Sequence, residues 1–405
     1  MCPVTPCGMR ASASRTVSSV YGHSPHTEET EHPYLEALLA LFIWGLNLVF
    51  SIASKLTPRW IRWCPTSPQQ LLEAESRMLM HLKMKFELRD VTIDNCTGGK
   101  EPHRIRTFTI QGDDNSLMPL VLLHGFGSGL GMWALNLDKL SQSGRRSVYA
   151  IDTLGFGSSS RPQFATEAAE VESQFMHSVE KWRQAVDLRK AIFIGHGLGG
   201  FIAASYTLKF PERVAHLVLV DPWGLPERSS HTERHLVIPS WAKMAVNLLH
   251  PFNPLGVLRA AGPLGPHLVR KFRPDLRKKF DHVISDRKVV PAYMYHMNTQ
   301  TPSGEAGFRC MMNSLGWARH PMLKRMAQIR PSIAITFVYG SRSWVDKGPG
   351  VRVKHMRPHS STEVEVVEGA GHHVYGDKPD EFNKLIIAVA EQVDVSPDNK
   401  DALLE

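Results

Sequence analysis

A glycine-rich turn between an apolar strand and a helical run constrains this chain most. Residues 190–195 are typical of a buried strand, residues 196–200 are HGLGG, and residues 201–210 are typical of a helix. Alternating glycines permit a sharp strand-to-helix turn that leaves no room for Cβ atoms. In turns of the form G-x-S-x-G the middle residue is a strained, exposed nucleophile. Gly197 stands at that position, so the turn has the backbone of a nucleophile elbow without the nucleophile.

The rest of the chain predicts a parallel sheet. Short, uniformly apolar strands alternate with helices from Val91 onward, which is typical of a sheet covered on both faces. The expected strands are 119–124, 147–152, 190–195, 214–221, 332–339 and 362–367. Helical segments with Pro and Gly breaks fill 224–331, which we expect to form a lid. The core then has two parts, 90–223 and 332–393, followed by a tail, 394–405.

Three further elements complete a known chain order. The sequence HGFG, with Phe126 third, follows the first expected strand; Asp346 and His372 follow the last two. Nucleophile position, acid and histidine in this order are typical of the α/β-hydrolase fold, which we predict here. The backbone N–H groups of Phe126 and Leu198 would then form the oxyanion hole.

Gly197 changes the expected chemistry. Formation of an acyl-enzyme needs an oxygen or sulfur that the histidine activates, and glycine supplies neither. We therefore expect no serine-hydrolase turnover. A slow water-mediated reaction and a binding pocket without catalysis both stay open.

A second pattern, H-x-x-x-x-D, runs from His372 to Asp377. It resembles the acyltransferase motif of glycerolipid synthesis, in which the histidine deprotonates an acceptor hydroxyl. The alternative is that Asp377 caps the helix that follows.

The first 89 residues differ from the core. Residues 1–34 are polar and expected to be disordered. Residues 35–56 contain the run ALLALFIWGLNLVFSIAS, which as a helix spans roughly 27 Å, just short of a ~30 Å hydrocarbon core. We expect a membrane-associating helix; a helix packed on the domain is the alternative. In segment 57–89, Trp60 and Trp63 alternate with arginines, which favours anchoring at a lipid surface, although two core tryptophans fit equally well.

The charge of the chain limits the classes of partner to expect, and its cysteine content indicates the cellular compartment. Lys and Arg total 47 against 39 Asp and Glu, a formal net charge of +8, which favours an anionic surface. Zinc-finger spacing and RNA-binding signatures are absent from the sequence, so we expect neither nucleic acid nor a metal. Five scattered cysteines are typical of a reducing compartment. The lid carries a basic series that would face solvent or anionic lipid: Arg259, Arg270, Lys271, Arg273, Arg277, Lys278 and Lys279.

Eight short segments together resemble one α/β-hydrolase subfamily. They are 63–67 (WCPTS), 122–127 (LLHGFG), 152–157 (DTLGFG), 160–162 (SRP), 221–224 (DPWG), 251–254 (PFNP), 300–305 (QTPSGE) and 373–375 (HVY). The subfamily contains a lysophospholipase that acts on N-acyl phosphatidylethanolamines and a lipid-droplet co-activator of adipose triglyceride lipase. The resemblance covers residues 59–393, and the first 58 residues depart from it.

The two branches of this subfamily differ at the elbow. The lysophospholipase branch carries serine there and the co-activator branch a residue that is not a nucleophile, so Gly197 sides with the co-activator. Arg342 and Gly371 also match the co-activator, for which the resemblance implies a role in lipase activation. Residues 316–323 and the pair His372 and His373 look closer to the lysophospholipase.

The resemblance implies a non-hydrolytic adaptor on the cytoplasmic face of lipid droplets and the endoplasmic reticulum, and in the cytosol. Its implied partners are a patatin-type triglyceride lipase, perilipin-type droplet proteins and the phospholipid surface. No cofactor is implied, and acyl-CoA is the candidate ligand. The alternatives are an acyl-CoA-dependent lysophosphatidic acid acyltransferase that uses His372 and Asp377, and a lysophospholipase or N-acyl phosphatidylethanolamine lipase that has lost its serine.

Overall fold

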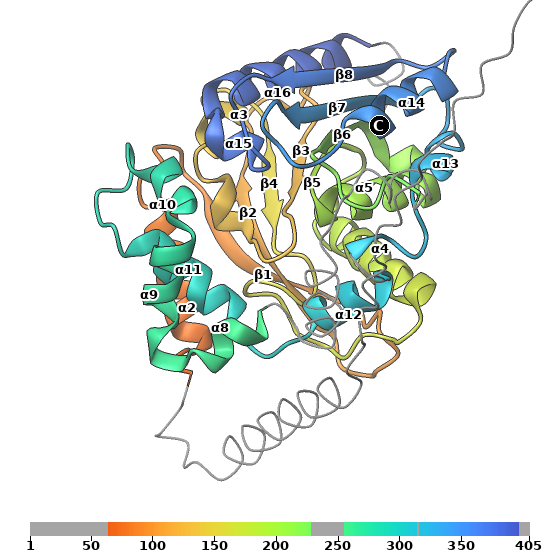
Figure 1. Cartoon of the computed structure of the whole chain (residues 1–405). Helices are drawn as coiled ribbons and strands as arrows, with labels where there is room; N and C mark the ends of the chain where they lie inside the picture. Colours follow the sequence, from red (N-terminus) through yellow and green to blue (C-terminus); the bar gives the residue numbers. More distant parts are fainter. Residues whose placement is uncertain (1–63, 228–254, 314–315, 397–405) are drawn as a thin grey trace, which may run out of the picture. The chain divides into compact units, whose positions relative to one another are not determined.

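A single eight-stranded sheet organises the described part of the chain (Figure 1). The computed structural model describes residues 64–227, 255–313 and 316–396, all within one compact unit, Thr57–Glu405. The strands are β1 (Glu87–Ile93), β2 (His103–Ile110), β3 (Leu120–Leu123), β4 (Val148–Ile151), β5 (Ala191–His196), β6 (Val214–Val220), β7 (Ala334–Gly340) and β8 (Thr362–Val367). Their order across the sheet is β1-β2-β4-β3-β5-β6-β7-β8. The pairs β1/β2 and β2/β4 are antiparallel, and every other neighbouring pair is parallel.

The six expected strands are confirmed as β3 to β8, each within two residues of its predicted ends. Their side chains alternate between two buried cores, as period-two geometry requires. In β3, Val121 and Leu123 enter one core, whereas Leu120 and Leu122 enter the other. Both faces of the sheet are therefore covered, and the α/β-hydrolase fold class is confirmed.

Helices from distant parts of the chain cover these two faces (Figure 1). The helices α4 (Ala168–Ala185), α5 (Leu198–Lys209) and α14 (Gly348–Met356) contribute to one core. The other core receives α2 (Pro68–Leu79), η1 (Leu130–Trp133), α3 (Leu137–Leu140), α15 (Val374–Asp377) and α16 (Pro379–Val395). A short 3₁₀ turn, η2 (Pro211–Arg213), precedes β6.

The insertion between β6 and β7 is helical where it is described, as the sequence predicts. It comprises α8 (Gly256–Ala260), η3 (Gly262–Leu264), α9 (Gly265–Phe272), α10 (Pro274–Phe280), α11 (Val289–Asn298), α12 (Gly304–Met311) and α13 (Leu323–Met326). Figure 1 shows α8 to α11 gathered beside α2, and α11 contacts both α2 and α9. The sequence SPQQ of residues 67–70 is typical of a capping box, and the Oγ atom of Ser67 accepts a 3.2 Å hydrogen bond from the N–H of Gln70, which confirms this cap of α2.

The predicted apolar helix, 35–56, and the two anchoring tryptophans, Trp60 and Trp63, lie outside the described residues. The same holds for 228–254 of the lid and for most of the tail, 394–405. In the described ranges, every helix is too short or too polar to cross a membrane.

Candidate active site

The predicted elbow joins β5 to α5. Gly197 has φ +53° and ψ −113°, a region that L side chains rarely occupy. The flanking glycines are needed for a different reason: a Cβ on Gly195 would lie 2.4 Å from the carbonyl oxygen of Gly199. The backbone of a nucleophile elbow is thus intact around a residue without a side chain.

His372 lies beside Gly197, in the loop after β8. A Cβ built on Gly197 would lie 3.8 Å from Nε2 of His372. The other ring nitrogen, Nδ1, donates a 3.3 Å hydrogen bond to Oδ2 of Asp221. Asp221 is fully buried at the end of β6, and its Oδ1 accepts a 3.3 Å hydrogen bond from the N–H of Gly340. His372 and Asp221 therefore form a dyad that faces the elbow.

The expected acid, Asp346, is not the partner of His372, and this prediction is corrected. Asp346 lies in the loop after β7, where its Oδ1 accepts a 2.9 Å hydrogen bond from the N–H of Gly348. Among the described residues no hydrogen bond or ion pair joins it to His372. The acid that bonds to His372 follows β6, the neighbour of β7 in the sheet, whereas the chain order had suggested the acid after β7.

Asp377 also has a role other than the two that the sequence suggested. Its Oδ2 accepts a 2.9 Å hydrogen bond from the N–H of Gly371, and its Oδ1 forms an ion pair with Lys279 of α10. In the described residues it bonds neither to His372 nor to the first turn of α16, whose N-cap is Lys378. Asp377 therefore fastens the histidine loop to the lid.

The two predicted oxyanion donors are open. In the described part of the chain, the N–H groups of Phe126 and Leu198 have no acceptor. Leu198 begins α5, so its N–H has no partner within the helix. Their role as oxyanion donors stays a prediction.

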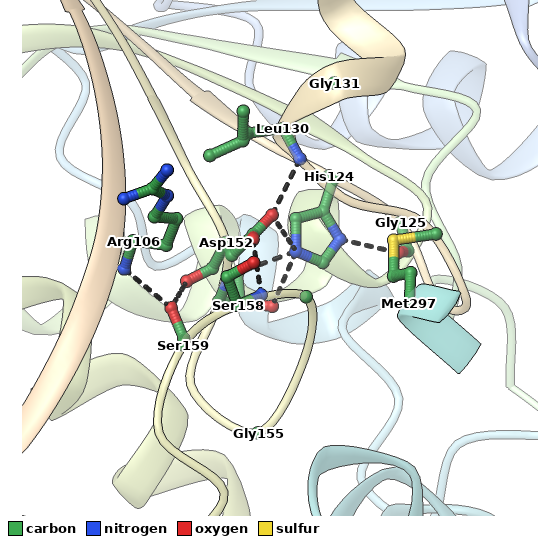
Figure 2. Close-up of polar contacts among 12 residues, drawn as sticks. Arg106, His124, Gly125, Leu130, Gly131, Asp152, Gly155, Ser158, Ser159 and Met297 are labelled. Atoms are coloured by element: carbon green, nitrogen blue, oxygen red, sulfur yellow. Dashed lines mark hydrogen bonds and ion pairs between the residues drawn. The ribbon is translucent and has the colours of Figure 1, made fainter. Parts of the chain in front are cut away.

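A buried polar network supports the loop that carries Phe126 (Figure 2). His124 donates from Nδ1 to the carbonyl of Gly125 at 2.8 Å and accepts at Nε2 from the N–H of Thr153 at 3.0 Å. Asp152 accepts from the N–H of Leu130 at 2.7 Å and from that of Ser158 at 2.8 Å. These bonds hold the HGFG loop against the end of β4.

Burial sets the electrostatics of this network. Desolvation raises the pKa of Asp152 and lowers that of His124. Burial, followed by the charge of Asp152, raises the pKa of Glu75 to about 7, although Arg106 pairs with Glu75 at 2.7 Å and opposes the shift. Glu75, on α2, thus titrates near neutral pH beside Arg106 of β2.

Two more histidines, His196 and His373, pack beside His372 at the elbow. His196, directly before Gly197, donates from Nε2 to the carbonyl of His372 at 3.0 Å. Burial, with the charges of His372 and His373, lowers its pKa well below the ordinary value. Burial also lowers the pKa of His373 to about 3. Both rings are neutral near pH 7, so they position the His372 loop without adding charge.

The loops that carry Arg342 and Gly371 converge, as expected. The N–H of Arg342 donates a 2.8 Å hydrogen bond to the carbonyl of Ala370. The Arg342 side chain is exposed, and no hydrogen bond or ion pair joins its guanidinium to another described residue. Beside it, Trp344 is 74% exposed, with its ring 5.2 Å from that of His372. We call Arg342, Trp344 and Gly371 the rim, and Gly197, Asp221, His372 and the two amides the floor.

The basic series of the lid is largely paired within the chain. Arg259 binds Glu305, Arg273 binds Asp275, Arg277 binds Asp281 and Lys279 binds Asp377. Lys271 and Lys278 are exposed. The series is therefore mostly a set of local ion pairs, and only part of it is available to an anionic surface.

A small pocket adjoins the lid, and Gly197 is not among its lining residues. Three motifs of the sequence meet there: Arg161 donates to the carbonyls of Gly155, Gly157, Thr301 and Met297. Its lining is Gly155, Phe156, Gly157, Arg161, Leu255, Arg259, Met297, Asn298 and Glu305. Asn298 donates to the carbonyl of Gly127 at 2.9 Å, which ties α11 to the HGFG loop.

Asp221 is the partner of His372 that the sequence did not predict. The sequence did contain a signal for this role. Asp221 directly follows a buried strand, and an acid at the end of the strand next to the elbow strand is a candidate partner for the histidine. Asp221 also has φ +41°, an uncommon value for a residue other than glycine, which is typical of a functionally constrained position.

The comparisons with known proteins agree with this fold. A model of the α/β-hydrolase fold matches residues 118–253. Human 1-acylglycerol-3-phosphate O-acyltransferase ABHD5 is 46% identical over 339 residues, covering 84% of this chain and 95% of that protein. Human (lyso)-N-acylphosphatidylethanolamine lipase is 45% identical over 329 residues, covering 81% and 94%.

Solved structures show the same fold. A bacterial membrane phospholipase A matches with a TM-score of 0.53 at 21% identity, over 88% of this chain and 99% of that one. Carboxylesterase CesB of Bacillus subtilis matches with a TM-score of 0.53 at 16% identity, over 79% and 97%. The chain belongs to the α/β-hydrolase family, in the subfamily of ABHD5 and the (lyso)-N-acylphosphatidylethanolamine lipase.

Proposed function

We propose that this protein is a non-hydrolytic adaptor that activates a patatin-type triglyceride lipase and so promotes triacylglycerol breakdown. The observation that carries the proposal is an intact elbow with glycine at the nucleophile position. The rim supports it, because Arg342 is exposed, has no side-chain partner among the described residues and can bind a carboxylate on another protein. The subfamily resemblance supplies the identity of that partner.

The same resemblance suggests the setting. We propose that the protein acts at the cytoplasmic face of lipid droplets and the endoplasmic reticulum, beside perilipin-type proteins, with long-chain acyl-CoA as ligand. The apolar run of 35–56 would supply attachment to the surface.

Lipase stimulation by purified protein tests the proposal. Fatty acid release from a triolein and phospholipid emulsion is measured with the lipase alone, with wild-type protein and with Arg342→Asn. We expect stimulation by the wild type and little by the variant. Full stimulation by a folded Arg342→Asn protein would remove the rim from the mechanism.

A second candidate function is acyl transfer from acyl-CoA to a lysophosphatidate. The dyad of His372 and Asp221 favours it, because a general base with an orienting acid is retained although the nucleophile is not. The ABHD5 relatives are named for this reaction. Formation of phosphatidate from labelled oleoyl-CoA and 1-oleoyl-glycerol 3-phosphate tests it.

The third candidate, a lysophospholipase that has lost its serine, predicts a different result. A fluorophosphonate probe needs a nucleophilic serine, so the wild-type protein should stay unlabelled. Labelling would show that another serine acts as nucleophile.

A further inference from the structure

We infer that the space above Gly197 receives the hydroxyl group of an acyl acceptor and that His372 with Asp221 deprotonates it. The acyl group then passes from a thioester donor directly to the acceptor, without an acyl-enzyme. This inference rests on the second candidate function and names the groups that perform it.

The side-chain position of Gly197 has room for a further atom, because its nearest described neighbours are at ordinary contact distance. A Cβ there would have the Cα of Gly125 at 3.7 Å and Nε2 of His372 at 3.8 Å as its nearest neighbours. A serine oxygen, about 1.4 Å from that Cβ, comes within the roughly 2.6–3.2 Å reach of Nε2 that general-base catalysis needs when its C–O bond points toward His372. Because glycine has no side chain, an oxygen of water or of a substrate alcohol can occupy this place.

His372 is set up to act as a base toward that oxygen. Asp221 accepts at Oδ2 from Nδ1, which holds the tautomer whose lone pair is on Nε2. Asp221 is fully buried and has Oδ1 fixed by Gly340. The resulting imidazolium would therefore be stabilised by a carboxylate that cannot turn away.

The two other acids near this loop are engaged elsewhere. The oxygens of Asp377 are used by Lys279 and by the N–H of Gly371. Asp346 accepts from Gly348. The motif from His372 to Asp377 thus fixes the loop, and Asp221 supplies the acid of the dyad.

The step balances with an acyl thioester and an alcohol. The hydroxyl oxygen attacks the thioester carbonyl carbon while its proton passes to Nε2 of His372. The developing oxyanion accepts hydrogen bonds from the N–H groups of Phe126 and Leu198. The C–S bond then breaks with its electron pair on sulfur, and the proton on Nε2 passes to the thiolate, which leaves an ester and a free thiol. Water in place of the alcohol gives the carboxylic acid.

Direct transfer has a kinetic signature. Both substrates must be bound together, so initial rates at varied concentrations of oleoyl-CoA and 1-oleoyl-glycerol 3-phosphate in mixed micelles should give intersecting double-reciprocal lines. Intact-mass measurements during turnover should show no covalently acylated protein. Gly197→Ser restores an oxygen that can be acylated, so this variant should gain an acylated species.

Charge-neutralising variants of the full-length protein identify the acid. We expect Asp221→Asn to lower kcat by roughly 10²- to 10⁴-fold, as removal of a general base or of its orienting acid does. Asp346→Asn and Asp377→Asn should stay at least about tenfold more active than Asp221→Asn. Asp380→Asn, an exposed carboxylate in the segment after the same loop, is the matched control.

A second variant tests the space itself and keeps the inference falsifiable if Asp221→Asn does not fold. Gly197→Ala places a methyl group at ordinary contact distance from His372 and fills the proposed hydroxyl site. Transfer should fall about tenfold or more, while circular dichroism and the melting profile show a folded protein. Unchanged transfer by Gly197→Ala would overturn the inference.

The outcomes separate this inference from the function on which it rests. Transfer that is lost in Asp377→Asn and retained in Asp221→Asn overturns the inference but keeps the acyltransferase. An acylated wild-type protein or parallel kinetic lines also overturn it. Absence of any transfer by wild-type protein that stimulates the lipase removes the acyltransferase and the inference together.

Discussion

The floor and the rim of the site lie side by side but differ in how their polar groups are used. On the floor, Asp221 is fully buried and both of its oxygens have partners, and Nε2 of His372 lies beside the side-chain position of Gly197. On the rim, Arg342 has no ion pair with a described residue and Trp344 is 74% exposed. The polar groups of the floor are therefore placed to act on a reacting atom, whereas those of the rim are available to groups outside the protein. The difference indicates that chemistry and partner binding can be lost separately.

The largest expected effect separates the two regions by charge reversal. Arg342→Glu should reduce lipase stimulation roughly tenfold or more, because a like-charge contact at an interface costs several kcal/mol. The melting temperature should not change, since the side chain has no partner among the described residues to lose. Fatty acid release from an emulsion measures the effect.

Lys347→Glu is the control, because Lys347 is an exposed cation in the same loop. An equal loss in both variants would mean that stimulation depends on the overall charge of the loop and not on Arg342.

The second expected effect concerns stability and should appear only on the floor. Asp221→Ala leaves the N–H of Gly340 buried without its acceptor, which should lower the free energy of unfolding by about 1–3 kcal/mol. Asp346→Ala removes an exposed carboxylate and should change it little. Urea denaturation followed by tryptophan fluorescence compares them. Equal losses would contradict the assignment of Asp221 as the inner acid.

A smaller effect is expected where the lid meets the histidine loop. Lys279→Met removes the ion pair with Asp377, in which the Lys279 side chain is 7% exposed. We expect faster hydrogen exchange in α10, equivalent to about 1 kcal/mol of local stability. Arg277→Met, which breaks the more exposed pair with Asp281, is the control and should have less effect. Faster exchange in Arg277→Met alone would show that the lid is not fastened through Asp377.

The smallest expected effect concerns Glu75 of α2, outside both the floor and the rim, and depends on pH. The folded protein raises the pKa of Glu75 from 4.5 to about 7, so the folded state holds this proton more tightly than the unfolded chain. Its contribution to stability is complete below pH 4.5 and is lost as the pH rises through 7.

Glu75→Gln tests this titration. The unfolding free energy of wild type minus that of Glu75→Gln should fall as the pH rises from 5 to 7.5. Urea denaturation at several pH values measures the difference. A difference that rises with pH would mean that the ion pair with Arg106 outweighs burial.

Much of the fold could be predicted from local patterns in the sequence. Apolar strands such as 214–221 and the Ser67 cap follow from periodicity and capping chemistry, and both agree with the structure. The elbow at Gly197 was recognisable because its glycines are required by close backbone contacts.

The acid that pairs with His372 was harder to predict from the sequence, because the order of residues in the chain does not show which strand end lies next to the histidine. The fold alone offers His372 three candidate acids: Asp221, Asp346 and Asp377. Only the hydrogen bonds of their side chains show which of them pairs with the histidine. The interaction of Asp377 with Lys279 depends on the position of the lid, for which the sequence carries no local signal.

The sheet order also has a consequence for folding. β6 and β7 are parallel neighbours, yet the whole lid, 224–331, lies between them in the chain. Closing a loop that long costs chain entropy before any contact repays it, so we expect β7 and β8 to join a preformed sheet late. Asp221 ends β6 and His372 follows β8, so their pairing marks the completion of folding. A chain that stops before this step exposes the edge of β6, whose seven residues are all buried in the finished sheet. That edge is where incompletely folded copies would begin to aggregate.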